Sequence, residues 1–130
     1  MKSAKRALRK LGARRVPTCE APVIFDPVVA PSLIRQLSGC LSGYSVYRGA
    51  SYLASCMGER IAAPGVTISD DGRRVGGLGS RPFDGEGLPT RRSVLVDGGR
   101  LRSWILDTYA ARKLGLASTG SAVRGGGAST

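Results

Sequence analysis

The sequence predicts an α+β fold with mixed short strands, one β-hairpin and three to four helices. The hairpin is predicted by Asp97-Gly98-Gly99, a turn sequence that stands between two segments of alternating side chains. Helices are predicted in several segments where apolar residues recur at helical spacing. The 19 glycines among 130 residues are about twice the average usage, so many of them must serve turns.

The first segment, from Ser3 to Leu11, has apolar residues at helical spacing and basic residues on the other faces, and Gly12 ends it. Seven Lys and Arg residues precede the first acidic residue, Glu20, so most of the net charge of +11 belongs to this end. Three interpretations are open: a solvated helix that packs on a preceding domain, a nucleic-acid contact, or an organelle transit peptide. The first is favoured, because no aromatic residues are interleaved for stacking on bases.

Short β-strands are expected where apolar runs end in turn residues. Ala21–Phe25 is expected to be a buried strand, because its apolar run stops at an Asp-Pro pair. Ile61–Ala63 and Val66–Ile68 are β-like pieces separated by a Pro-Gly pair, and the segment from Ser69 to Gly72 has the composition of a turn.

A helix is expected between the first of these strands and Gly43. Pro31 suits its first turn, and the apolar residues share one face. These residues are Leu33, Ile34, Leu37, Cys40 and Leu41. Cys40 is interpreted as a small core residue and not as a nucleophile, because the chain has no histidine to activate a thiol. The mixed pattern from Tyr44 to Met57 favours an irregular segment followed by a helical turn.

The hairpin is expected to pair Arg92–Val96 with Arg100–Leu106, because Asp-Gly and Gly-Gly accept the positive φ angles of tight turns. Asp107 is then expected to cap a helix that stops at Gly115. The last stretch, Ser118–Thr130, is almost entirely small and polar. It is therefore either a disordered tail or a segment that needs further structure to order it.

No ordinary zinc site can be built from this sequence. It contains no histidine, and its cysteines, Cys19, Cys40 and Cys56, lie far apart without a CxxC spacing. Histidine-dependent nucleophilic mechanisms are excluded for the same reason. The odd cysteine count without a secretory stretch favours a reduced cytoplasmic setting, and no apolar run is long enough to span a bilayer. The glycines from Gly76 to Gly79 resemble a phosphate-binding loop in composition only.

Candidate binding residues cluster around two acids. Asp84 and Glu86 would share one face of an extended strand, and the glycines beside them would let another backbone approach. Such a strand edge would line the path of a bound peptide. The alternative, a plain acidic turn, is favoured. Arg48 and Thr119 are added as polar contacts, although an ordinary turn explains each equally well. The candidate substrate-path residues are Asp84, Gly85, Glu86, Gly87, Arg48 and Thr119.

Three segments carry a resemblance to a known family: Ala63-Pro64-Gly65-Val66, the stretch from Phe83 to Gly87, and the stretch from Asp107 to Gly120. They resemble the PmbA branch of the TldD/PmbA metallopeptidase family, also called TldE and once described as a modulator of DNA gyrase. The resemblance covers roughly Arg14 to Arg124. It implies a cytoplasmic heterodimer, in which a TldD partner holds zinc and the pair degrades peptides or unfolded proteins.

The resemblance also implies which subunit this chain is similar to. The histidine motif of the catalytic branch falls on the helix matching Leu33 to Leu41, where this sequence has Arg35, Gln36 and Cys40. Neither metal ligands nor a general base carry over, so no catalytic residue, metal or cofactor is expected in this chain. Zinc is expected in the TldD-like subunit.

The resemblance further implies that the chain is a central fragment of a larger two-domain subunit. Residues 1–20 would end an amino-terminal α/β domain, and residues 21–130 would begin a β-rich carboxy-terminal domain that is truncated here. The expected role is to shape the heterodimer and guide a peptide substrate, with no membrane association. The alternative is a small basic nucleic-acid-binding protein, and a third possibility is a peptidase in its own right.

Overall fold

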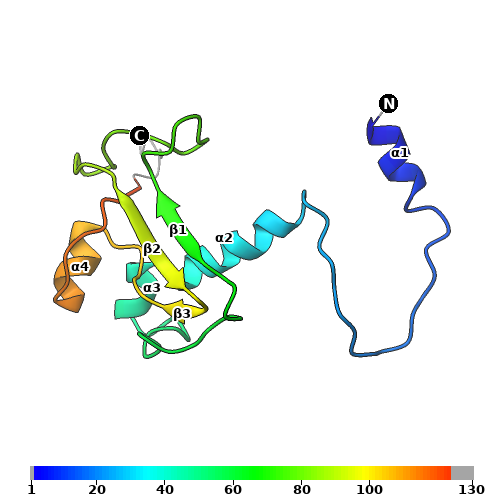
Figure 1. Ribbon diagram of the computed structural model, residues 1–130, viewed down its shortest axis with the longest axis horizontal. Helices are drawn as coiled ribbons and strands as arrows, with labels where there is room; N and C mark the ends of the chain where they lie inside the picture. The colour runs from blue at the N-terminus through cyan, green and yellow to red at the C-terminus, as the bar shows by residue number, and fades with distance from the viewer. Residues whose placement is uncertain (1, 124–130) are drawn as a thin grey trace, which may run out of the picture.

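A computed structural model describes residues 2–123 of the chain. Four helices and one three-stranded antiparallel sheet, with strand order β1-β2-β3, are formed within them, so the predicted α+β class is confirmed (Figure 1). The elements are α1 (Lys2–Leu8), α2 (Ala30–Cys40), α3 (Gly43–Tyr47), β1 (Ile68–Asp71), β2 (Arg92–Asp97), β3 (Arg100–Leu101) and α4 (Thr108–Leu114).

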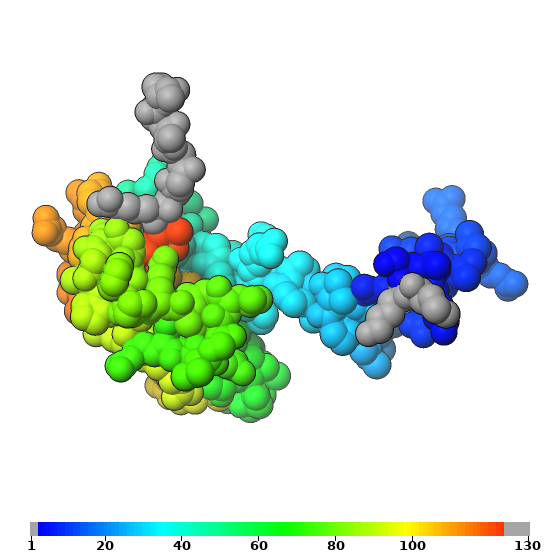
Figure 2. Space-filling view, turned by 90° about the horizontal axis from the view of Figure 1, so that it is seen from above, coloured from blue at the N-terminus to red at the C-terminus, as the bar shows by residue number. Residues whose placement is uncertain are grey.

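The elements from α2 onward form a body, and α1 stands apart from it. In Figure 1, α3 and α4 lie beside the sheet, and α2 passes under the sheet and extends outward toward the N-terminal segment. Figure 2 shows the same separation from above, with α2 bridging the body and the N-terminal residues. The only ion pair described for α1 joins Arg6 to Asp26, at 3.3 Å, in the turn that precedes α2. None of the helices among residues 2–123 has the length and apolarity that crossing a membrane requires.

The hydrophobic core lies where α2, α3 and α4 meet the sheet. Its most deeply buried large side chains are Leu41, Leu53, Leu101 and Val96. Leu37 and Cys40 pack against this core from α2, and Leu41 after it is buried, which confirms the carboxy-terminal part of the predicted apolar face and the core role of Cys40. The amino-terminal part of that face was predicted wrongly, because Leu33 and Ile34 are 48% and 50% exposed and do not pack on the core. Burial of such side chains is the main favourable term in folding.

The predicted hairpin is present, although its second strand is shorter than expected. Val96 pairs with Leu101, and Gly98 and Gly99 have φ angles of 54° and 78° in the turn. The strand ends at Leu101 because the next two amides, of Arg102 and Ser103, both donate to the carbonyl of Leu95. The chain therefore turns out of the sheet long before Leu106.

Helix α4 forms as its flanking residues predict. Asp107 Oδ1 accepts a hydrogen bond from the amide of Ala110 at 2.6 Å, and Gly115 ends the helix in the left-handed region with φ of 68°. The cap satisfies one of the amides that a helix N-terminus leaves without a partner.

Three expectations about strands and turns are wrong. Ala21–Phe25 is not a strand: the side chain of Ile24 is 98% exposed, and no described residue pairs with the segment. Ser69, Asp70 and Asp71 belong to β1 and not to a turn, because β2 provides a partner strand for them. The turn follows at Gly72. Ile61–Ala63 forms no strand, although Ile61 and Ala62 donate to the carbonyl of Gly99.

Two further segments differ from expectation. Between Tyr44 and Met57 the helical part, α3, comes first and the irregular part follows it. Within Ser118–Thr130, the described residues pack on the body, where Thr119 and Ala122 are each 6% exposed. They are ordered by polar contacts to distant segments and not by apolar burial alone. Residues 124–130 lie outside the described part of the chain.

Candidate functional site

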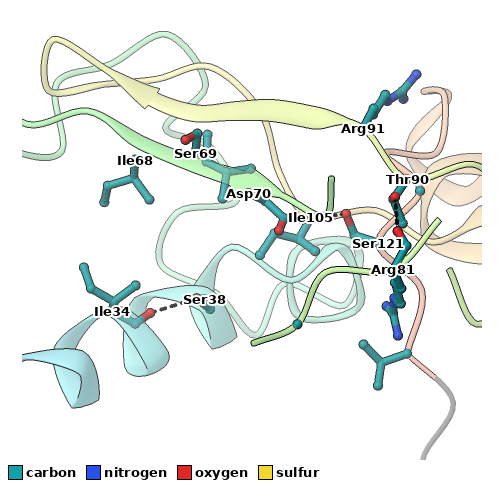
Figure 3. A pocket seen from close by; sticks show the side chains of 15 residues that line it. Ile34, Ser38, Ile68, Ser69, Asp70, Arg81, Thr90, Arg91, Ile105 and Ser121 are labelled. Atoms are coloured by element: carbon teal, nitrogen blue, oxygen red, sulfur yellow. Dashed lines mark hydrogen bonds between the residues drawn. The ribbon is translucent and has the colours of Figure 1, made fainter. Parts of the chain in front are cut away.

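A cleft of about 390 Å³ lies between α2 and the sheet. Ile34 and Ser38 line it from α2, and Ile68 and Asp70 line it from β1 (Figure 3). Ile105 forms part of its floor, so this end of the cleft is apolar. An extended segment of another molecule would meet apolar side chains from a helix on one side and from a strand on the other.

The opposite end of the cleft is polar. Ser121 Oγ donates a hydrogen bond to Asp70 Oδ2 at 2.7 Å, and Thr119 Oγ1 donates to Ser121 Oγ at 3.1 Å. Arg81 and Arg91 also line this end (Figure 3). The segment of residues 118–123 thus lines one end of the cleft, and the hydrogen bond of Ser121 to Asp70 ties it to β1.

Asp84 is a structural carboxylate in an acidic turn. Its side chain accepts hydrogen bonds from the amides of Glu86 and Leu88, both at 2.9 Å, and from the amide of Ala122 at 3.1 Å. The residue is 4% exposed. Burial raises the pKa of Asp84, but the three backbone donors, with Arg81 nearby, outweigh it and hold the pKa below its usual value.

The rest of that turn is tied to the body in the same way. Glu86 accepts from the amide of Thr108 at 2.9 Å and from its hydroxyl at 2.7 Å, so it stabilises the first turn of α4. Gly85 donates its amide to the carbonyl of Ala122 at 2.8 Å, and Gly87 has a positive φ of 83°. The acidic turn that the sequence favoured is therefore the observed conformation.

Thr119 and Arg48 occupy different environments. Thr119 Oγ1 accepts from the amide of Leu106 at 2.8 Å, which fixes residues 118–123 beside the end of the cleft. Arg48 is exposed at the end of α3, where its guanidinium lies 5.1 Å from the ring centroid of Tyr44 and hydrogen-bonds its hydroxyl. The fold thus brings the acidic turn against the segment that contains Thr119, through Ala122, and it leaves Arg48 at the end of α3.

Several residues of the cleft could not be found from the sequence. Asp70 lies in a Ser-Asp-Asp-Gly stretch that has the composition of a turn, and Ser121 lies in a stretch of small polar residues. They are 51 positions apart, and only the fold brings them into contact. The sequence carried no signal for this pair.

The donor set of this chain does not fit a zinc ion. The sequence has no histidine, and among residues 2–123 no three His, Cys, Asp or Glu side chains are grouped closely enough to hold a metal ion. On α2, Arg35 and Gln36 are exposed and Cys40 is partly buried. An arginine cannot ligate a cation, and a glutamine is not among the usual zinc ligands.

Comparison with known proteins gives a consistent result. Residues 18–130 match the family described as the PmbA/TldA metallopeptidase C-terminal domain. The chain is 43% identical over 119 residues to the metalloprotease PmbA of Escherichia coli O157:H7, with 92% of this chain and 26% of that protein covered. The chain therefore spans about a quarter of the length of that relative.

Two solved structures are similar as well. A protein from Bacteroides thetaiotaomicron described as a modulator of DNA gyrase superposes with a TM-score of 0.86 at 33% identity, covering 94% of this chain and 28% of that one. TldE from Thermococcus kodakarensis gives a TM-score of 0.60 at 34% identity, covering 65% of this chain and 19% of that one.

Proposed function

Because this chain belongs to the PmbA/TldD metallopeptidase family, we propose that it is a non-catalytic, PmbA-like part of a zinc-dependent peptidase complex. Proteolysis is the activity of the family. The observation that carries the proposal is the absence of histidine from all 130 residues, because zinc peptidases hold their metal mainly through imidazole. A TldD-like partner would hold the zinc and the general base, and the pair would act in the cytoplasm on peptides or unfolded proteins.

In this proposal the cleft under β1 guides the substrate. Its support is the position of α2, the helix on which the resemblance locates the catalytic motif in the partner branch. Ile34 and Ser38 of that helix line the cleft, so a peptide in the cleft would run beside the positions that carry metal ligands in a catalytic subunit. In this protein, the residues at those positions of α2 can only contact and orient the peptide substrate.

The candidate substrate-path residues take a narrower role in this proposal. The carboxylate of Asp84 already accepts three backbone hydrogen bonds, and the hydroxyl of Thr119 is engaged with Leu106. They hold the wall of the path in place instead of touching the substrate. Gly85 and Gly87 provide backbone at the turn, and Glu86 fixes the start of α4. Arg48 is exposed, so an acidic group could reach it in competition with its contact to Tyr44.

The test compares the chain alone, a TldD-like zinc subunit alone, and their mixture. We expect the chain alone to bind no stoichiometric zinc and to leave an unstructured peptide intact, and the mixture to elute as one complex that cleaves the peptide. Ile34→Asp, which places a charge in the cleft, is expected to lower cleavage by the mixture. Leu33→Asp is the matched control, because Leu33 is 48% exposed and Ile34 is 50% exposed, but only Ile34 lines the cleft.

Two outcomes would contradict the proposal. Cleavage by the isolated chain, abolished by a chelator and restored by zinc, would show that the chain is itself a metallopeptidase. Equal cleavage by the mixtures with Ile34→Asp and Leu33→Asp would show that the cleft does not guide the substrate.

A further inference from the structure

A second cavity, of about 460 Å³, lies on the side of β2 that β3 leaves open. Strand β3 pairs only with the last two residues of β2, Val96 and Asp97. Within residues 2–123, the residues from Arg92 to Val94 therefore have a strand neighbour on the β1 side only, and the cavity lies beside them. An open strand edge offers backbone donors and acceptors to an extended chain.

The cavity combines an apolar wall with two cations. Val94, Leu106 and Leu116 contribute apolar surface, and the side chain of Leu116 is 49% exposed. Arg91 and Arg102 line the same space, and no acidic residue does. Such a lining suits a carboxylate attached to an apolar body, because a guanidinium pairs with carboxylates through two parallel hydrogen bonds.

Neither arginine is committed to a buried partner. Arg102 lies 3.9 Å from Asp97, and the side chains of both are more than half exposed. Arg91 donates to the carbonyl of Ser118, a neutral acceptor. Exposed pairs of this kind contribute little to stability, so both guanidinium groups can reorient toward a ligand at low cost.

The wall of the cavity also contains an unsatisfied donor. Trp104 is 8% exposed, and its indole Nε1 has no hydrogen-bond partner within residues 2–123, the only buried side-chain nitrogen or oxygen there in that state. A buried N–H without an acceptor is costly and rare in native proteins. Trp104 lines the cavity, so a ligand bound there would lie close to its side chain.

We propose that this cavity binds the carboxyl terminus of a peptide whose last side chain is apolar. The carboxylate pairs with Arg91 and Arg102, the last side chain packs on Val94 and Leu116, and the peptide backbone lies along the open edge of β2. The choice of a peptide rests on the proposed function, whereas the choice of a carboxylate rests on the cavity itself. The site shares only Arg91 with the cleft under β1.

Trp104 is the only tryptophan of the chain, so its fluorescence reports binding directly. The 130-residue chain is titrated with acetyl-Ala-Leu, with acetyl-Ala-Leu-amide and with hexanoate. We expect saturable quenching or a spectral shift with the free acid, and affinity weaker by about tenfold for the amide, because it loses a charged hydrogen-bonded pair. Hexanoate, an apolar carboxylate without a peptide backbone, is expected to bind more weakly than acetyl-Ala-Leu.

Variants locate the site. Arg91→Gln and Arg102→Gln are each expected to weaken acetyl-Ala-Leu binding by about tenfold. Arg73→Gln is the matched control, because Arg73 is exposed, lies outside β2 and does not line the cavity, so the affinity of this variant should not change. Far-ultraviolet circular dichroism establishes that each variant is folded before it is titrated.

Three results would overturn the inference: no fluorescence response, equal affinity for the acid and the amide, or hexanoate binding as tightly as the peptide. The titration needs no zinc subunit and no cleavage. Failure here would therefore leave the proposed function standing, and failure of the cleavage test would leave this binding site standing.

Discussion

At the scale of single residues, buried Asp84 has the largest structural role of the predicted site residues. Its carboxylate joins the acidic turn to Ala122, which lies 38 positions later in the chain. The two oxygens of a carboxylate can accept all three backbone hydrogen bonds. The amide of an asparagine has only one oxygen, so its NH₂ group would face at least one of these backbone N–H donors. The negative charge is therefore needed for the packing of residues 118–123.

Asp84→Asn is expected to lower the free energy of unfolding by about 1–3 kcal/mol, because a buried donor loses its acceptor. Urea denaturation followed by circular dichroism measures this change. Glu59→Gln is the control, because Glu59 is exposed and no hydrogen bond or ion pair is described for its side chain. An Asp84→Asn protein as stable as the Glu59→Gln protein would show that the carboxylate is dispensable.

The same residue predicts how stability depends on pH. The pKa of Asp84 is lower in the folded chain than in the unfolded chain, so its contribution is fully present above the unfolded pKa. The contribution is lost as the pH falls through the folded pKa. The difference in unfolding free energy between the native protein and Asp84→Asn should therefore be constant near neutrality and shrink in acid below about pH 4. If this difference in unfolding free energy instead grew in acid, the pKa of Asp84 would be raised and not lowered by folding.

At the scale of elements, the hairpin depends on close backbone contact. Gly99 has a φ of 78°, and a Cβ at this position would collide with the carbonyl oxygen of Ala62 and would lie 2.6 Å from that of Ala63. The amides of Ile61 and Ala62 also donate to the carbonyl of Gly99. The turn thus holds the segment before β1 against the sheet, in addition to reversing the chain.

Gly99→Ala and Gly58→Ala separate the cost of a strained backbone from the cost of a steric clash. Gly58 also has a positive φ, of 83°, but an added Cβ would meet no atom within 4 Å. Gly58→Ala should cost about 1–2 kcal/mol from backbone strain alone. Gly99→Ala should cost about 1–3 kcal/mol more, because overpacking is added. Thermal or urea unfolding of both variants provides the comparison, and equal losses would mean that the segment before β1 simply moves aside.

The N-terminal cap of α4 can be tested independently. Asp107→Ala removes the acceptor of the Ala110 amide and is expected to cost about 1 kcal/mol of unfolding free energy. Asp107→Asn, which keeps a side-chain oxygen at the cap, should recover most of that loss in the same urea titration. A loss of equal size in both variants would assign the effect to charge and not to the hydrogen bond.

At the scale of the whole molecule, the sequence predicted the features whose signals are local. Asp107 and the glycine after α4 define that helix, and Gly98-Gly99 define the hairpin turn, without reference to distant residues. Of the predicted β-like piece Val66–Ile68 only Ile68 is in a strand, and the rest of β1 was missed because a stretch of turn-forming residues becomes a strand only beside β2. The acidic turn was found for the same local reason, whereas the contact of Asp70 with Ser121 depends on the complete fold.

The N-terminal region remains the least embedded part of the molecule. Val23, Ile24 and Phe25 are 69%, 98% and 45% exposed, and two more apolar residues in the turn before α2 are half exposed or more. A run of exposed apolar residues with unpaired backbone is prone to associate with other chains. We therefore expect the chain to self-associate through this region as its concentration rises.

Ile24→Lys tests this expectation against Val75→Lys. Both native side chains are almost fully exposed, at 98% and 99%, so both variants should unfold with nearly the native free energy. Only Ile24 lies in an apolar run, since Val75 stands between Arg74 and Gly76. Sedimentation velocity over a range of concentrations should show less association for Ile24→Lys and native association for Val75→Lys. A native chain that stays monomeric throughout would mean that the exposed run is not adhesive.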